Sequence, residues 1–294
     1  MGVRGGYMNV FSTFHPLLLS IYYCFVLVML YCLHPVVAML ALIGAVAYFC
    51  ALTGWHLTLK ELVFYSFIFL FVMIAYSSFV HNGYTPLFFL NDQPITYEAT
   101  MKAIVWATII VGIAFWSKSY FEMFTTTKIL FLASMISTKL GIFLSMLLRF
   151  IPIFKQHWQE RQLAQKAIGY YHVASQVEKL QRFVVLWSST LMFTIEFVFF
   201  KPAVMRARGY GVGKRTQFQL IRFTKKDALF AVFLFISMTL FALFFEYYAY
   251  HYYPKLKSNT LSSSQIFMIA IFMLLPAMYE LKENAKWIYL QSKI

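Results

Sequence analysis

The stretch LLLSIYYCFVLVMLYCL, from Leu17 to Leu33, is a nearly continuous apolar run that ends at His34 and Pro35. A strand with one solvated face would alternate apolar and polar residues, whereas a continuous run of this length indicates a helix. A membrane-spanning helix needs about 20 apolar residues, with a usable range of about 17–25. The run therefore predicts a helix that crosses a lipid bilayer.

Five further runs have a similar length and composition, and they are Pro35–Leu52, Leu62–Val80, about Ala99–Trp116, Ala228–Tyr248 and Gln265–Tyr279. Only 12% of the residues are charged and 61% are hydrophobic, whereas soluble domains carry about 25% charged residues. Lipid offers no hydrogen-bond partner to the backbone, so each span must be helical or part of a closed barrel. We therefore predict an all-α polytopic membrane protein with about six transmembrane helices.

Basic residues are concentrated in one region of the chain. Residues 118–226 hold 17 of the 25 Lys and Arg residues but only 4 of the 11 acidic ones, in a chain of net charge +14. Cytoplasmic loops of membrane proteins carry an excess of Lys and Arg. With the N-terminus inside, six spans place 22 of the basic residues on the cytoplasmic side. The sequence therefore predicts that both termini are cytoplasmic.

The same pattern divides the chain into an N-terminal membrane domain with four spans, a helical module, and two further spans with a cytoplasmic tail, at residues 1–116, 117–226 and 227–294. Within the module, Lys128–Leu148 and Phe183–Phe200 are apolar enough to resemble spans. If both crossed, the six basic residues between them would lie outside, and Lys139 and Glu196 would lie within spans, where charges are costly. We therefore favour a cytoplasmic or interfacial module over an eight-span arrangement.

The spans carry few groups that could perform chemistry. The interiors of the first three contain no Asp, Glu, Lys or Arg, whereas ion-coupled transporters and proton pumps usually need ionisable groups near the middle of the membrane. The three cysteines lie inside apolar runs, and the seven histidines are scattered without metal-ligand spacing. No HExxH or GxSxG motif is present. We therefore predict no catalytic residue, no metal site and no cofactor bound by this chain.

The basic, glycine-rich segment AVMRARGYGVGKRTQF, Ala203–Phe218, contrasts with the apolar chain around it. A phosphate-binding loop of the Walker type needs Ser or Thr after its Gly-Lys pair. Here Gly213 and Lys214 are followed by Arg215, and no strand pattern precedes them. The glycines also follow a GxGxG spacing rather than the GxGxxG of dinucleotide-binding turns. We therefore disfavour nucleotide binding by this segment.

The residues before these glycines favour a helix end instead. A helix-compatible pattern runs from Phe183 to Arg208, and we expect it to be interrupted at Pro202. Gly209 is a natural stop, because glycine enters the left-handed conformation at little cost. Arginines such as Arg206 and Arg208 are favoured near a helix C-terminus by the helix dipole. The pattern predicts a basic helix tip that faces anionic lipid or pairs with a partner carboxylate.

A second segment, PIFKQHWQERQLAQKAIGYY from Pro152 to Tyr171, has a related design. Polar and apolar residues recur at helical spacing on opposite faces, which indicates an amphipathic helix. It ends in Ala167-Ile168-Gly169, so it shares an Ala-x-Gly ending with the first segment. Two such helix ends on the cytoplasmic side suggest paired contacts with a partner of two subunits.

These segments resemble signatures of the transmembrane T component of energy-coupling factor (ECF) transporters, the family that includes the CbiQ-type cobalt permease subunit. The resemblance is strongest over KPAVMRARGYGVGKRTQFQLIRFTKKD, Lys201–Asp227, which contains an Ala-Arg-Gly signature. It continues in Arg149-Phe150-Ile151-Pro152, in Glu160 with Ala164-Gln165-Lys166-Ala167, and in Phe14-His15-Pro16. Specific motifs thus cover residues 149–227, and general architecture covers the rest.

The resemblance implies a function without an active site in this chain. A T component couples two ABC-type ATPase subunits, which bind the ATP, to a membrane-embedded substrate-binding S component that takes up a vitamin or a transition-metal cation. This implies a multi-pass subunit of a bacterial cell membrane, in contact with lipid and with no nucleic acid partner. A stand-alone permease or channel is the alternative, although mid-membrane charges are missing. A membrane enzyme is the third class, but the acidic residues form no cluster.

The resemblance also assigns residues to ATPase docking. The second signature matches Ala207, Arg208 and Gly209. The first matches Ala167 and Gly169, but Ile168 stands where the family has arginine, so we expect the two contacts to be unequal. The supporting residues of the two coupling helices are Arg149, Pro152, Glu160, Gln165, Arg206, Lys214 and Arg215.

Overall fold

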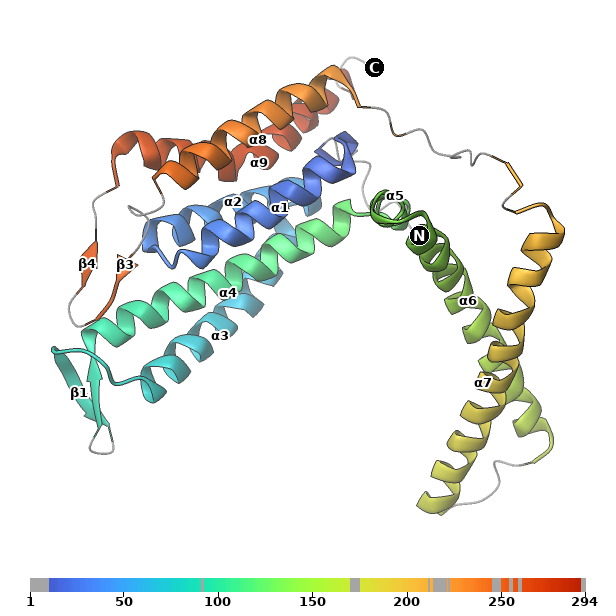
Figure 1. Cartoon of the computed structure of the whole chain (residues 1–294). Helices are drawn as coiled ribbons and strands as arrows, with labels where there is room; N and C mark the ends of the chain where they lie inside the picture. Colours follow the sequence, from blue (N-terminus) through green and yellow to red (C-terminus); the bar gives the residue numbers. More distant parts are fainter. Residues whose placement is uncertain are drawn as a thin grey trace. The chain divides into compact units, whose positions relative to one another are not determined.

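The computed structural model describes residues 11–90, 93–169, 175–210, 212–213, 221, 223–244, 250–253, 256–258 and 261–291. This part of the chain is mostly helical (Figure 1). Its helices are the 3₁₀ turn η1 (Phe11–Thr13), α1 (Pro16–Tyr31), α2 (Pro35–Thr53), α3 (Trp55–Phe79), α4 (Tyr97–Met123), α5 (Thr126–Ile136), α6 (Thr138–Ala167), α7 (Gln176–Ala207), α8 (Lys225–Leu243) and α9 (Ser263–Gln291). The prediction of an all-α polytopic membrane protein is confirmed.

Six helices in the described ranges are long and apolar enough to span a membrane, namely α2, α3, α4, α7, α8 and α9. The expected number is therefore confirmed, although the helices that reach this length and composition are not all the expected ones. The run from Leu17 yields α1, a helix of only 16 residues, because the chain turns at Leu33, whose φ is +54°. Conversely, α7 has 32 residues and meets the criteria of length and composition, although we interpreted its apolar run as part of a non-spanning module.

The apolar run Lys128–Leu148 does not form one helix. The chain breaks at Ser137, whose backbone is extended (φ −155°, ψ 132°), and the break separates α5 from α6. The 11 residues of α5 are too few to cross a bilayer. Helix α6 then continues through Pro152, and α7 continues through Pro202. The expected interruption at Pro202 is therefore wrong, since a proline removes one helical hydrogen bond but the neighbouring bonds keep the helix intact.

The chain divides into two compact units. Residues 1–128 and 222–294 form the first, which we call the membrane bundle, and residues 129–221 form the second, which we call the helical hairpin. The bundle contains α1 to α4 together with α8 and α9, so segments from both ends of the chain pack against one another (Figure 1). The hairpin consists mainly of α6 and α7, which pack against each other.

Helix α2 lies between α4 and α9 in the bundle. Small residues allow the close approach: a Cβ atom added to Gly44 would lie only 2.6 Å from the carbonyl oxygen of Met273 on α9. On the other side, Trp116 of α4 donates a hydrogen bond from Nε1 to the carbonyl oxygen of Ala41, over 3.1 Å. Small residues at helix contacts and satisfied polar groups are the usual means of packing helices in lipid.

The N-terminal segment Phe11–His15 is bound to three other parts of the bundle, and we call it the N-terminal clasp. The amide of Phe11 donates to Glu280 of α9 over 2.9 Å, and the amide of His15 donates to Asp227 of α8 over 2.8 Å. Lys128 donates from Nζ to the carbonyl oxygen of Ser12 over 2.5 Å, and burial lowers the pKa of this lysine to about 8. The clasp therefore connects the start of α1 to α8, α9 and the start of α5.

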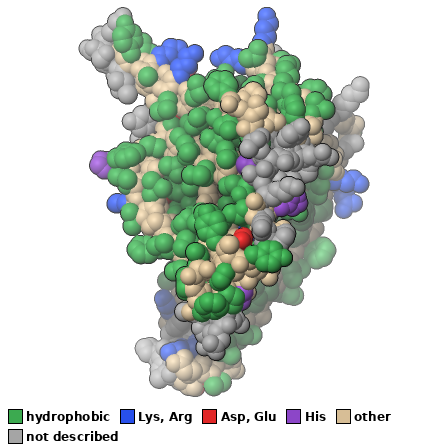
Figure 2. Space-filling model, turned by 90° about the vertical axis from the view of Figure 1, so that its left-hand side faces the viewer, with side chains coloured by type: hydrophobic (Ala, Val, Ile, Leu, Met, Phe, Trp, Pro, Cys, Tyr) green, Lys and Arg blue, Asp and Glu red, His purple; other side chains and the backbone are tan. Residues whose placement is uncertain are grey.

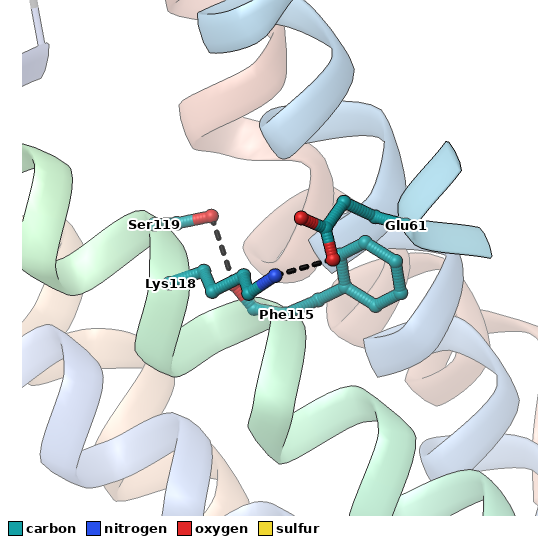
Figure 3. Close-up of polar contacts among 4 residues, drawn as sticks. All are labelled: Glu61, Phe115, Lys118 and Ser119. Carbon is teal, nitrogen blue, oxygen red and sulfur yellow. Dashed lines mark hydrogen bonds and ion pairs between the residues drawn. The ribbon is translucent and has the colours of Figure 1, made fainter. Parts of the chain in front are cut away.

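An ion pair also joins two of the long helices of the bundle. Lys118 of α4 forms an ion pair with Glu61 of α3 (Figure 3), and its Nζ lies 5.1 Å from the centre of the Tyr65 ring. Figure 3 also shows the hydroxyl of Ser119, which donates to the carbonyl oxygen of Phe115 within α4. The Glu61–Lys118 pair joins the beginning of α3 to the end of α4, so it holds two spans together away from their midpoints.

Two short antiparallel ribbons occur in the loops that connect helices, at the end of the bundle away from the N-terminal clasp. Strands β1 (Pro86–Leu90) and β2 (Gln93–Thr96) lie between α3 and α4, and β3 (Tyr250–His251) and β4 (Lys257–Ser258) lie between α8 and α9. Both ribbons appear at the left in Figure 1. We did not expect these strands, because they occupy segments whose sequence is typical of loops.

Candidate functional site

The helical hairpin brings together most of the residues that the sequence singles out. Its two helices run antiparallel, as the aromatic contacts between them show. Phe154 of α6 lies 6.0 Å from Trp187 of α7, measured between ring centres, and Trp158, one turn later on α6, lies 5.8 Å from the earlier residue Phe183. Since higher numbers on α6 pair with lower numbers on α7, the C-terminal ends of the two helices lie at opposite ends of the hairpin (Figure 1).

The end of α7 has the geometry that its sequence predicts. The helix ends at Ala207, Arg208 is the C-cap, and Gly209 follows with φ +83°. The amide of Gly209 donates to Arg206 over 3.0 Å, and the amide of Tyr210 donates to Met205 over 3.0 Å. These two bonds define a Schellman motif, in which a left-handed residue lets the chain satisfy the last helical carbonyls. Ala207, Arg208 and Gly209 are all exposed.

The end of α6 repeats this geometry with a different central residue. The helix ends at Ala167, Ile168 is the C-cap, and Gly169 has φ +77°. The amide of Gly169 donates to the carbonyl oxygen of Lys166 over 3.1 Å, which corresponds to the bond from Gly209 to Arg206 on α7. The side chain of Ile168 is 82% exposed. The hairpin thus presents two similar helix ends, one with a cation at its tip and one with an apolar residue.

A cleft of about 640 Å³ lies between α6 and α7 beside the Arg208 end. Its charged lining residues are Arg149 of α6 and Glu196, Lys201 and Arg208 of α7, and the remaining lining is mostly apolar. In the described part of the chain, no ion pair joins Arg149, Glu196 or Arg208 to a partner. Three cations and one carboxylate give the cleft an excess positive charge, so it suits an acidic group presented by a partner.

The other predicted residues are distributed along the hairpin. Glu160 accepts a hydrogen bond from Gln156 over 2.9 Å and pairs with His157 over 3.0 Å, so it serves contacts within α6. Pro152 is exposed and Gln165 is partly buried on the same helix. Arg206 is exposed near the end of α7. The predicted supporting residues Lys214 and Arg215 lie outside the described residues.

Sequence reasoning did not assign Glu196 and Lys201 to a site, although both line the cleft. The helical spacing of residues on α7 could have placed Glu196 on the same face as Arg208. Glu196, Phe200, Val204 and Arg208 are four residues apart and therefore lie on one face of α7. What the spacing could not supply is Arg149, which comes from the facing helix and reaches the same cleft only through tertiary packing.

Possible metal ligands do not gather in the described ranges. No group of three or more His, Cys, Asp and Glu residues there is placed to hold a metal ion. The cysteines Cys24, Cys32 and Cys50 are all free thiols. Comparison with known proteins does not assign a family: no protein-family model matches the chain, and a search of curated proteins finds no match. The function is therefore inferred from the residues of the hairpin and their geometry.

A first prediction concerns the left-handed glycine at the end of α7. Gly209→Ala would add a methyl group that meets no atom within 4 Å, so only the backbone conformation penalises it, by about 1–2 kcal/mol. We expect faster amide hydrogen exchange over residues 205–210 and an unchanged melting temperature. Gly213→Ala is the matched control, because this exposed glycine has no neighbour within 4 Å and no left-handed backbone. Equal exchange in both variants would show that the tip does not depend on Gly209.

Proposed function

We propose that this chain is the membrane coupling subunit of an ATP-driven importer of the ECF type, in a bacterial cell membrane. The observation that carries the proposal is the pair of exposed Ala-x-Gly helix ends on α6 and α7, each stopped by a glycine with positive φ. Such a subunit passes the movement of two ABC-type ATPases to an S component that binds a vitamin or a transition-metal cation. ATP is bound and hydrolysed by the partners.

The antiparallel arrangement supports contact with two partner subunits. Helices α6 and α7 have 30 and 32 residues, and a helix rises 1.5 Å per residue, so each is about 45 Å long. Their C-terminal ends point in opposite directions along the hairpin, so each ATPase of a pair can take one end. A movement that brings the two ATPases together would then act on both ends of the hairpin at once.

The chemistry of the two ends supports unequal contacts. Arg208, with Arg149 and Lys201 in the adjoining cleft, suits a carboxylate, because a guanidinium forms paired hydrogen bonds with both carboxylate oxygens. Ile168 at the other end can contribute only apolar contact. We therefore expect one ATPase subunit to be held mainly by charge and the other mainly by apolar packing.

The surface of α7 supports a further membrane-embedded partner or direct lipid contact. Large apolar side chains on this helix are exposed, including Phe183, Met192, Phe199 and Phe200. Many exposed large apolar side chains on one helix are typical of a protein or membrane contact. Cover by an S component, with lipid around it, would account for this surface.

The decisive experiment is purification of the tagged full-length chain from its native membranes in mild detergent. We expect ABC-type ATPase subunits and a small membrane protein to co-purify, with measurable ATP hydrolysis. Arg208→Glu should lower the recovered ATPase at least about tenfold, or about 1.4 kcal/mol in binding free energy, because a carboxylate would then face a carboxylate.

Lys155→Glu is the matched control for this charge reversal. Lys155 is an exposed cation in the middle of α6, away from both helix ends, so its reversal should leave ATPase recovery unchanged. If Arg208→Glu retains both ATPases, the docking assignment is wrong. If no ATPase accompanies the wild-type chain and the purified chain alone moves a solute across liposomes, a stand-alone permease is the better description.

A further inference from the structure

The ribbon formed by β1 and β2 exposes apolar side chains on both of its faces. Phe88 and Phe89 are neighbours on β1, so they point to opposite faces of the ribbon. Their exposed fractions are 52% and 68%, and Leu87 beside them is 55% exposed. Antiparallel strands commonly bury one face and expose a polar face to water. In this ribbon Ile95 of β2, the partner of Phe88, is only 5% exposed, but β1 exposes apolar side chains on both of its faces. The exposed side chains of β1 therefore require an apolar environment on both sides.

The base of the ribbon is fixed to α4. Glu98, in the first turn of α4 and only 3% exposed, accepts hydrogen bonds from the hydroxyl of Thr85 over 2.8 Å and from its amide over 3.3 Å. The hydroxyl of Thr96 donates to the carbonyl oxygen of Asn82 over 2.7 Å. The amide of Tyr97 donates to Thr85 over 2.9 Å. The exposed aromatic side chains are therefore held in a defined position relative to the bundle.

The direction of the ribbon indicates where it lies relative to a membrane. In Figure 1, β1 runs across the direction of α3 and α4 rather than along it. Because these helices are long enough to cross the membrane, a strand across their ends lies along the membrane surface. Figure 2 views the molecule from the side where the strands lie in Figure 1, and many hydrophobic side chains are exposed on that face.

Lipid accounts for this surface better than a folded partner does. A partner docked on a two-stranded ribbon covers one face, whereas lipid surrounds both. The apolar surface also continues onto α3, where Ile74 and Phe79 are 61% and 85% exposed. Open strand edges are not tolerated in the hydrocarbon core, which limits the depth to the interfacial region. Exposed tyrosines at the ribbon's base, Tyr84 and Tyr97, suit that region, since their rings favour the interface.

We propose that the β1–β2 ribbon is an interfacial anchor, which inserts Phe88 and Phe89 into the headgroup and upper acyl region of the leaflet at the α3–α4 connection. It fixes the depth and tilt of the α3–α4 pair, because the ribbon is bonded to the first turn of α4. This role is independent of ATPase docking, which concerns residues of the helical hairpin.

Spin labels on the full-length chain test the proposal. The native cysteines are replaced (Cys24→Ser, Cys32→Ser, Cys50→Ser), and single cysteines are introduced as Phe88→Cys and Phe89→Cys. The labelled protein is reconstituted into vesicles of phosphatidylcholine and phosphatidylglycerol. Collisions of each label with oxygen, which partitions into lipid, are compared with collisions with a water-soluble nickel chelate. Phe71→Cys, on the exposed surface of α3, reports the hydrocarbon core, and Ser262→Cys, in the exposed segment before α9, is the matched polar site.

For both ribbon labels we expect an oxygen-to-nickel collision ratio at least about twofold above that of Ser262→Cys and below that of Phe71→Cys, which is the interfacial value. A water-like ratio at both positions would overturn the proposal. Strong immobilisation with little access for either reagent at one position would overturn it too, because it would show a protein partner on that face. Gel filtration of the cysteine-free chain confirms that the background variant is folded.

Discussion

Gly44→Ala is expected to destabilise the membrane bundle by about 2–3 kcal/mol, although it adds only one methyl group. The new Cβ would lie 2.6 Å from the carbonyl oxygen of Met273 and 3.0 Å from its Cβ. The nearest atom belongs to the backbone of α9, so it cannot rotate away, and α2 and α9 must separate. That separation would loosen the neighbouring contact in which the hydroxyl of Tyr22 donates to the carbonyl oxygen of Phe272 over 3.0 Å.

Gly112→Ala is the matched control for this prediction. Gly112 also lies within a spanning helix, but a Cβ there would meet no atom within 4 Å. Alanine should therefore be neutral at position 112, or stabilising by up to about 1 kcal/mol through its higher helix propensity. Thermal denaturation of both variants in the same detergent measures the difference. Equal melting temperatures would mean that α2 and α9 are not in close contact through Gly44.

Asp227→Ala is expected to have the second large effect, a loss of about 3 kcal/mol. Asp227 is only 3% exposed and accepts three hydrogen bonds, from the amide of His15 over 2.8 Å and from the amide and hydroxyl of Thr224 over 2.8 and 2.7 Å. Removal of the carboxylate deprives three partly buried donors of their charged acceptor, and together the lost bonds account for about 3 kcal/mol. It also breaks the capping box at the start of α8.

The position of Asp227 explains why its loss should lower the thermal stability of the membrane bundle. Asp227 lies in the first turn of α8, and its hydrogen bond with His15 ties that turn to the N-terminal clasp. The apparent melting temperature should fall by roughly 5–10 °C, whereas Lys226→Ala, at an exposed neighbouring residue, should leave it unchanged. Asp227→Asn keeps one acceptor oxygen and should give an intermediate value. A melting temperature for Asp227→Ala equal to the wild type would show that the clasp does not stabilise the bundle.

Local sequence signals predicted the ends of the hairpin helices. Ala167 and Ala207 end their helices because Gly169 and Gly209 adopt the left-handed conformation, which is a property of the residue type and its immediate neighbours. Pro202 misled the same reasoning at a finer scale. A proline lowers helix propensity locally, but it does not end a helix whose remaining hydrogen bonds and contacts persist, as Pro202 shows.

The sequence predicted that the spans are helices, but it predicted less well where each helix begins and ends. Composition requires helices in lipid, and hydropathy placed the first span at Leu17–Leu33. The charges within and beside the apolar run in α7 led us to set that run aside. The left-handed turn at Leu33 shortens α1, and the residues from Gln176 onward lengthen α7. Both limits depend on backbone conformations at the ends of an apolar run rather than on its hydrophobicity.

Some features depend on residues that are far apart in the sequence. The cleft joins Arg149 to Arg208, and the clasp joins His15 to Asp227 across 212 positions. No periodicity within a single segment can show such pairs, because helical spacing relates residues only to neighbours within a few turns. The β1–β2 ribbon escaped notice for a related reason: its strands are five and four residues long and gain their identity by pairing with each other.

The sequence by itself determined the solvent of this protein and the helical character of its spans. Long apolar runs with few charges require a lipid environment, where every backbone group must be bonded within the chain, so the spans are helical. It also determined the two Ala-x-Gly helix ends, because a glycine stop is a local property. Only the tertiary structure decided that the N- and C-terminal spans form one bundle, that the two helix ends lie at opposite ends of the hairpin, and that three cations and Glu196 share a cleft. Those arrangements arise from packing between distant segments, and local propensity carries no information about them.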